Sequence, residues 1–269
     1  MSAATYVVPA SGPGPVVEPG VVRRVEQVMG MPISLALRGR HADTSTGAEA
    51  WESVLASLRW SDDVFSTWRA ESLISRLGRG ELAVTDCPPE VAEVLALGEA
   101  ARRATGGAFD VRRVVDGRAV LDPSGIVKGW AVDRASAALR DLDDTDFCLS
   151  AGGDLVCSAV PDRPTWRIGV EDPRDPTRVL AVVPVRTGAV ATSGAAHRVE
   201  HVRHAVTGLA PTGVASVTVV HSSLTIADLD ATCAYLEGAG AAGWLRERGR
   251  TGVVVAPDGA AEVVSGRSG

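Results

Sequence analysis

Lys128 is the only lysine in the chain, and every other basic residue is an arginine. It lies in the segment LDPSGIVKGWAVD (121–133), which begins with the composition of a turn and is typical of a helix from 126 to 140. The first amides of a helix lack internal partners and carry the positive end of its dipole, so a lysine beside them favours an anion site. In the alternative interpretation, Asp122 or Ser124 caps the helix and Lys128 faces water.

A carboxylate and a hydroxyl share one face of another predicted helix. Asp228 and Thr232 lie four residues apart in IADLDATCAY, within a helix predicted over 224–238. Oxygen ligands of this kind suit a hard cation such as Mg2+. The alternative is that Asp228 complements the dipole at the start of the helix and Thr232 bonds back to its own backbone. Asp230 points away from this face, and we expect it to be solvated.

Three of the five histidines, His197, His201 and His204, lie close together in TSGAAHRVEHVRHAVTG. Spacings of four and three would suit zinc on a helix, but this segment is typical of strand and turn, which divides the three between two faces. One histidine acting as a base or proton shuttle is the better interpretation, because imidazole changes its charge near neutral pH. The alternative is that all three are polar loop residues without a chemical role.

The composition excludes several classes of protein. Hydrophobic residues make up 45% of the chain and charged residues 22%, with a net charge of −6, so a globular protein without the basic excess that nucleic acid requires is expected. We expect no membrane span and no signal peptide, and hence a cytoplasmic location. The four cysteines form no CxxC pair, and we expect free thiols rather than a zinc site.

Hydrophobic periodicity predicts an α+β fold with mixed β-sheets flanked by helices. Residues 22–38 are expected to form two strands, and the chain from 145 onwards is rich in strand patterns. Helices are predicted over 46–60, 89–104, 126–140 and 224–238, with a short helix capped by Glu71 or Ser72. We expect 1–20 to be a flexible tail and 21–265 to be a single domain.

Three further features are weak signals when taken singly. TGGAFD (105–110) and SAGGD (150–154) are glycine-rich turns that end in Asp, and Trp68 is either a core residue or a stacking platform for a planar ring. In their order along the chain, however, the motifs resemble those of the FAD:protein FMN transferase family, the ApbE-like flavin transferases. The matching motifs are VMGMPISL, FSTWRAESLISRL, TGGAFD, LDPSGIVKGWAVD, LSAGGDL, WRIGVEDP, AVATSGAAHR and ADLDAT. The short segment between AFD and LDPSG is similar to a compact, actinobacterial-style branch of that family.

The resemblance implies a fold, an activity and a set of site residues. The expected fold is ApbE-like, with two intimately packed halves. The expected reaction cleaves FAD at its pyrophosphate, transfers FMN to a Thr or Ser hydroxyl in the flavinylation motif of an acceptor protein, and releases AMP with the help of Mg2+. By their places in the motifs, Asp228, Thr232 and the carbonyl of Gly125 correspond to the metal ligands, and His201 to the histidine of the transfer step. The residues that correspond to FAD-binding positions are Met29, Trp68, Ala108, Phe109, Asp110, Asp122 and Lys128.

One motif departs from the family pattern. The family commonly reads His-Ile-x-Asp-Pro-x-Thr-Gly where this chain reads HVRHAVTG (201–208), so that His204 and Ala205 stand in place of Asp-Pro. The resemblance therefore leaves two alternatives to a transferase. One is an FAD-binding protein without transfer activity, and the other is an FAD pyrophosphatase that releases FMN and AMP.

Overall fold

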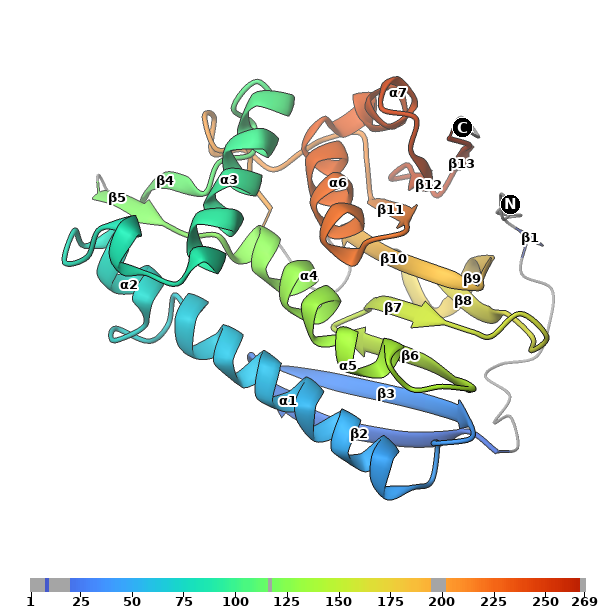
Figure 1. Ribbon diagram of the computed structural model, residues 1–269. Helices are drawn as coiled ribbons and strands as arrows, with labels where there is room; N and C mark the ends of the chain where they lie inside the picture. Colours follow the sequence, from blue (N-terminus) through green and yellow to red (C-terminus); the bar gives the residue numbers. More distant parts are fainter. Residues whose placement is uncertain (1–7, 10–19, 116–117, 195–201, 267–269) are drawn as a thin grey trace.

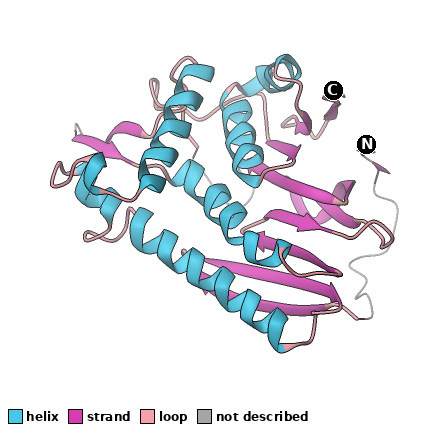
Figure 2. Cartoon of the chain, viewed as in Figure 1, coloured by secondary structure: helices cyan, strands magenta, loops and turns pink. Residues whose placement is uncertain are grey.

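A computed structural model describes residues 8–9, 20–115, 118–194 and 202–266 of the chain. An eight-stranded β-sheet lies at the centre of its fold. Helices cover one face of this sheet, and a smaller sheet lies behind it (Figure 1). Helices and strands are interspersed along the chain (Figure 2), which confirms the expected α+β class.

The strand pairs of the large sheet are all antiparallel within the described residues, which corrects the expectation of mixed sheets. Direct hairpins join β2 to β3, β6 to β7 and β12 to β13, and a hairpin forces its two strands to run in opposite directions. In spatial order the strands are β13 (Ala261–Val264), β12 (Thr251–Val255), β11 (Ser216–His221), β10 (Thr187–Gly194), β7 (Asp154–Ser158), β6 (Thr145–Ala151), β3 (Met31–Gly39) and β2 (Val22–Val28).

The turn between β2 and β3 has an unusual backbone. It contains only Met29 and Gly30, which both have positive φ, at 56° and 71°. A two-residue hairpin of this type needs positive φ at both central positions, and glycine adopts it at little cost. A methionine there is uncommon, and non-glycine residues in this region cluster at functional sites.

The helices begin close to the predicted positions. They are α1 (Ser45–Phe65), α2 (Leu73–Gly78), α3 (Pro89–Ala104), α4 (Ser124–Ala135), α5 (Ala137–Arg140), α6 (Leu224–Leu236) and α7 (Ala241–Glu247), with 3-10 turns at Val84–Asp86 and Gly238–Gly240. Of the two expected caps for α2, Ser72 is the one that accepts a hydrogen bond from a first-turn amide. The helix predicted over 126–140 starts two residues earlier and divides at Ser136.

Aromatic packing fixes α4 against its neighbours. The rings of Trp60, Phe65 and Trp130 form a cluster in which Phe65 and Trp130 meet edge to face at 5.3 Å. The indole N–H of Trp130 donates to Glu93 on α3 at 3.0 Å. Because α1, α3 and α4 meet there, the helix that carries Lys128 is held on two sides.

Side chains of the central sheet alternate between two apolar cores. Leu35 and Leu37 of β3 face the helices, whereas Ala36 faces the smaller sheet. That smaller sheet consists of β1 (Val8–Pro9), β9 (Asp175–Val185) and β8 (Trp166–Asp172). The core on the helix side is one contiguous cluster whose residues come from along the chain between Val28 and Val264, so the two expected halves share one core.

Four short strands and α-helices after residue 20 were not predicted. They are the hairpin of β4 (Arg112–Val115) with β5 (Arg118–Leu121), the helix α7, and the edge strand β13. Within the expected flexible tail, Val8–Pro9 pair with β9, and the rest of 1–19 lies outside the described residues.

The cysteines agree with the expectation of free thiols. All four cysteines are free, and burial raises the pKa of the Cys148 thiol to about 12. Among the helices of the described residues, none combines the length and the apolar character that crossing a bilayer requires.

Candidate active site

A close contact between α4 and α6 forms the base of the site. A Cβ atom at position 129 would lie 2.7 Å from the Cβ of Asp228 and 2.9 Å from the carbonyl oxygen of Leu224, so only glycine allows the two helices to approach this far. The amide of Gly129 donates a 2.9 Å hydrogen bond to Oδ2 of Asp228. In a regular helix that amide donates to the carbonyl of residue 125. Asp228 therefore competes for the hydrogen that the Gly125 carbonyl would otherwise accept.

Lys128 lies between two buried carboxylates. Its ammonium forms a close ion pair with Oδ2 of Asp154 on β7 and lies 3.4 Å from Oδ1 of Asp228. The side chains of Asp154 and Asp228 are only 2% and 4% exposed, so water screens these charges weakly. The Lys128 side chain is 23% exposed but directs its ammonium at these two carboxylates, which disagrees with the alternative in which it faces water.

Burial and mutual contact shift the pKa values within the cluster formed by Lys128, Asp154 and Asp228. Burial disfavours the Lys128 ammonium, but the carboxylates of Asp228 and Asp154 outweigh this effect and raise the pKa of Lys128 above its ordinary value. Burial also raises the pKa of Asp228, against the lowering influence of Lys128. Two acids share one base here, so the cluster can accept a further positive charge.

Strand β10 supports both ends of this cluster. The amide of Thr192 donates to Oδ1 of Asp154 at 2.9 Å, and the hydroxyl of Ser193 lies 2.9 Å from the hydroxyl of Thr232. Thr232 is 8% exposed and lies one turn along α6 from Asp228. Consecutive residues of one strand thus position Asp154 and Thr232.

The turn that contains Ala108, Phe109 and Asp110 lies beside the start of α4 and borders the candidate site there. A Cβ atom at Gly125 would lie 3.1 Å from the ring of Phe109, so this ring packs against the start of α4. The Ala108 carbonyl accepts a 2.8 Å hydrogen bond from the amide of Ala205. Asp122 also borders the start of α4, and its Oδ1 accepts from the Ser124 amide at 3.1 Å.

His204 holds the turn at 204–208 through its side chain. Its Nδ1 accepts hydrogen bonds from the amides of Val206 at 3.2 Å and Thr207 at 3.4 Å. An aspartate side chain commonly bonds amides two and three residues later in a turn, and here an imidazole makes those bonds. The turn therefore forms even though Asp-Pro is replaced by His204-Ala205.

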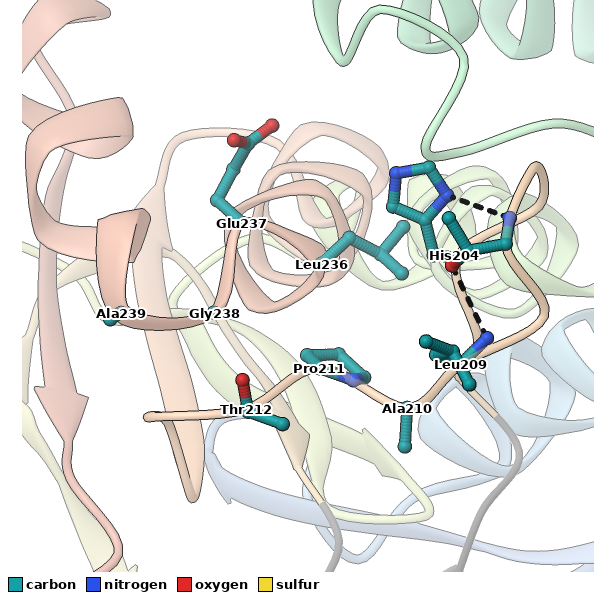
Figure 3. A pocket seen from close by; sticks show the side chains of 10 residues that line it. His204, Leu209, Ala210, Pro211, Thr212, Leu236, Glu237, Gly238 and Ala239 are labelled. Atoms are coloured by element: carbon teal, nitrogen blue, oxygen red, sulfur yellow. Dashed lines mark hydrogen bonds between the residues drawn. The ribbon is translucent and has the colours of Figure 1, made fainter.

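Two open cavities flank this turn. One, of about 350 Å3, separates the turn from the C-terminal end of α6, and Figure 3 shows His204, Leu236 and Glu237 around its opening. The other, of about 560 Å3, lies between the turn and Gly106-Gly107 and is lined by Arg102, Asp110 and Arg112 among others.

The sequence profile of the ApbE family matches residues 29–115 and 112–255. The chain belongs to the ApbE family. A protein of Treponema pallidum named FAD:protein FMN transferase is 34% identical over 137 residues, which cover 44% of this chain. The match covers 38% of the length of that relative.

Solved structures support the same fold. The ApbE protein from Thermotoga maritima has a TM-score of 0.77 and 21% identity, and the similarity covers 90% of this chain and 96% of that one. The flavin transferase ApbE from Vibrio cholerae has a TM-score of 0.75 and 19% identity, with 91% and 97% covered. At these identities the comparison shows the fold alone.

The ApbE fold brings together some of the predicted residues but not all of them. Lys128 and Asp228 are in contact, Gly125 lies one turn before Gly129 on α4, and Thr232 lies one turn after Asp228 on α6. Trp68 lies in the loop before α2 and is 96% exposed, which excludes its interpretation as a core residue. Met29 lies in the β2–β3 turn. His197 and His201 lie outside the described residues.

Three residues differ from the sequence-based expectations. Asp230 is not solvated: it is 9% exposed and bonds Nε of Arg250 at 2.5 Å. Asp154 was noted only as the end of a glycine-rich turn, yet it is the main partner of Lys128. Ser193 was also missed. The motifs SAGGD and TSG were the available signals for these two residues.

The donor groups of Asp228, Thr232 and the Gly125 carbonyl are of the chemical types that suit a hard cation. Within the parts of the chain that the structure describes, no three His, Cys, Asp or Glu residues form a metal-binding cluster. The available donors are instead one carboxylate, one hydroxyl and one backbone carbonyl, which are ligand types that Mg2+ accepts together with water or phosphate oxygens. The shared lysine leaves one carboxylate charge of the pair Asp154–Asp228 without a cation, which favours such an ion.

Proposed function

We propose that this chain is an FAD:protein FMN transferase that depends on Mg2+. In the proposed reaction a Thr or Ser hydroxyl oxygen of an acceptor protein attacks the phosphorus of the FMN half of FAD. The new P–O bond makes a phosphoester, the bond between the two phosphates breaks, and AMP leaves. The hydroxyl proton passes to a base, for which the family resemblance indicates His201.

A single observation carries this proposal: two buried carboxylates share the only lysine of the chain at the N-terminal part of a helix. Asp228, Thr232 and the Gly125 carbonyl would hold Mg2+, and Lys128 and the first amides of α4 would contact phosphate oxygens. Mg2+ bound there would withdraw charge from the pyrophosphate. The competition between Asp228 and the Gly125 carbonyl for the Gly129 amide supports Gly125 as a ligand.

Two of the remaining FAD contacts are proposed from the exposure of the Trp68 side chain and from the backbone conformation of Met29. Trp68 is almost fully exposed, and an indole in that state offers a flat face on which the flavin ring can stack. The positive φ of Met29 is consistent with a residue held in place to contact a ligand. Ala108, Phe109, Asp110 and Asp122 would line the FAD beside the start of α4.

The experiment combines the protein with FAD, Mg2+ and an acceptor protein that carries a flavinylation motif. The expected result is equal amounts of AMP and acceptor-bound FMN, measured by chromatography and by mass spectrometry of the acceptor. An acceptor whose target Thr is replaced by Val is the matched control, and it should stay unmodified.

The same experiment separates the alternatives. Free FMN and AMP formed without an acceptor would identify a pyrophosphatase. Tight FAD binding with neither product would identify a flavin-binding protein and overturn the transferase proposal. The preserved turn at His204 supports transfer, since it removes the main structural reason to expect an inactive protein.

A further inference from the structure

Asp154 is a buried carboxylate for which the proposed reaction gives no role. Its side chain is 2% exposed, and Oδ1 accepts a hydrogen bond from the amide of Thr192. Oδ2 has no hydrogen-bond partner within the described residues and only the ion-pair contact with Lys128. The Asp154 carboxylate therefore has one charged partner within the described residues, which is the ammonium of Lys128.

Stability alone does not account for this arrangement. Removing an ammonium and a carboxylate from water costs several kcal/mol for each ion, and a well-packed apolar pair in the same place is often as stable. A buried ion pair is therefore weak evidence for a structural role. It does fix the direction of the lysine side chain.

The position of the ammonium between the two acids is asymmetric. It is in close contact with Asp154 but 3.4 Å from Asp228. Without Asp154, Asp228 would be the one remaining carboxylate in contact with Lys128 within the described residues. A direct pair with Asp228 would occupy the oxygen that the proposed Mg2+ requires, because an ammonium and a metal ion compete for the same carboxylate.

We propose that Asp154 is a positioning residue that draws Lys128 toward itself, prevents a closer pair with Asp228, and so keeps the Asp228 carboxylate available to a divalent cation. This inference rests on the metal site of the proposed function. The two carboxylates of the cluster then have separate roles: Asp154 holds Lys128, and Asp228 binds the cation.

The test is a double-mutant cycle on cation binding rather than on activity. Mn2+ is titrated into the full chain, and the free ion is measured by electron paramagnetic resonance for the wild type, Asp154→Asn, Lys128→Met and the double variant. The Asn substitution retains an oxygen acceptor for the Thr192 amide and replaces the charged oxygen that faces Lys128 with an NH2 group, which cannot pair with the ammonium. We expect Asp154→Asn to weaken Mn2+ binding about tenfold when Lys128 is present, and about twofold or less in the Lys128→Met background.

The cycle distinguishes positioning from simple charge. If Asp154→Asn weakens Mn2+ binding equally in both backgrounds, Asp154 is only a nearby negative charge and the inference is wrong. Asp230→Asn is the matched control, since it removes an enclosed carboxylate from the same helix as Asp228 but pairs with Arg250. It should change Mn2+ affinity little. A wild-type protein that does not bind Mn2+ would overturn the metal site itself, and the inference with it.

A measurement on the wild type covers the case in which Asp154→Asn does not fold. Because Lys128 is the only lysine, 13C-labelled lysine gives one set of side-chain signals in the whole chain. The inference predicts that Mg2+ leaves the Lys128 Cγ and Cδ shifts, which report the rotamer, almost unchanged. A rotamer change on Mg2+ addition would show that the contact with Asp154 is lost when the ion binds, and would contradict the proposal.

Discussion

Asp228 and Asp230 lie two residues apart on α6, and both are enclosed, yet their surroundings differ. Asp230 pairs with Arg250 at 2.5 Å, and this cation balances its charge. Asp228 shares Lys128 with Asp154, so the two acids exceed the base by one charge. A balanced pair is sufficient to join two elements of a fold, whereas an excess of buried acid is tolerated where a ligand supplies the missing charge. Local charge balance thus separates the structural aspartate from the candidate metal ligand.

Replacing each of the two aspartates separately tests this comparison and should give the largest effect of the predicted substitutions. Asp228→Ala is expected to lower Mg2+-dependent AMP release by at least about a hundredfold, because the carboxylate that would hold Mg2+ against the reacting phosphate is lost. Asp230→Ala should leave the rate within about threefold and lower the free energy of unfolding by about 2 kcal/mol through the loss of its hydrogen bond with Arg250. Rates and chemical denaturation of both variants check this. Equal rate losses would contradict the distinction.

The close contact of α4 and α6 provides the next prediction. Gly129→Ala should destabilise the protein by about 1–2 kcal/mol even though Ala is the better helix former, because its Cβ would collide with Asp228 and the Leu224 carbonyl. Thermal unfolding measures this effect. Gly125→Ala is the control: its Cβ would meet only the Phe109 ring, at 3.1 Å, and we expect a smaller change. An unchanged melting temperature in Gly129→Ala would show that the helices tolerate a wider spacing.

A smaller effect is expected at the turn that departs from the family pattern. His204→Asp supplies the same acceptor to the amides of Val206 and Thr207 and should retain transfer activity. His204→Ala removes the acceptor, and the loss of about 1 kcal/mol of hydrogen bonding should lower the transfer rate about fivefold. Single-turnover transfer measures both variants. Equal rates for Asp and Ala would mean that the imidazole bonds do not hold the turn.

The smallest effect is expected at Ser193, which contacts a proposed ligand but carries no charge. Ser193→Ala removes the hydroxyl that lies 2.9 Å from the Thr232 hydroxyl and should weaken Mn2+ binding about threefold. Ser193→Thr retains a hydroxyl and should restore the affinity. If neither substitution changes Mn2+ binding, the orientation of Thr232 does not depend on β10.

Local patterns in the sequence were sufficient for most of the fold. Alternation of apolar residues predicted β2 and β3, and helical periodicity predicted α1, α3 and α6. Among the missed elements, the strands β4, β5 and β13 have four residues each, which is too short for periodicity to be distinct. The antiparallel direction of the large sheet was also missed, because strand direction depends on connections between distant segments.

The candidate site was predictable only where its chemistry is local. Lys128 is distinguished by composition, and the Asp228–Thr232 pair by helical spacing. The partnership of Asp154 with Lys128 arises because β7 passes beside α4, and the pairing of Asp230 with Arg250 joins α6 to the start of β12. Spacing within one element carries no information on such contacts, so an aspartate expected in water proved to be enclosed and a turn residue proved to be central.

Diffraction from crystals soaked in Mn2+ would locate the cation itself. Anomalous scattering is expected to give one peak at the contact between α4 and α6, bounded by the Asp228 carboxylate, the Thr232 hydroxyl and the Gly125 carbonyl. In the same map Lys128 should remain against Asp154. A peak elsewhere, or Mn2+ bound at Asp230 and not at Asp228, would contradict the assignment of the surplus acid to a metal site.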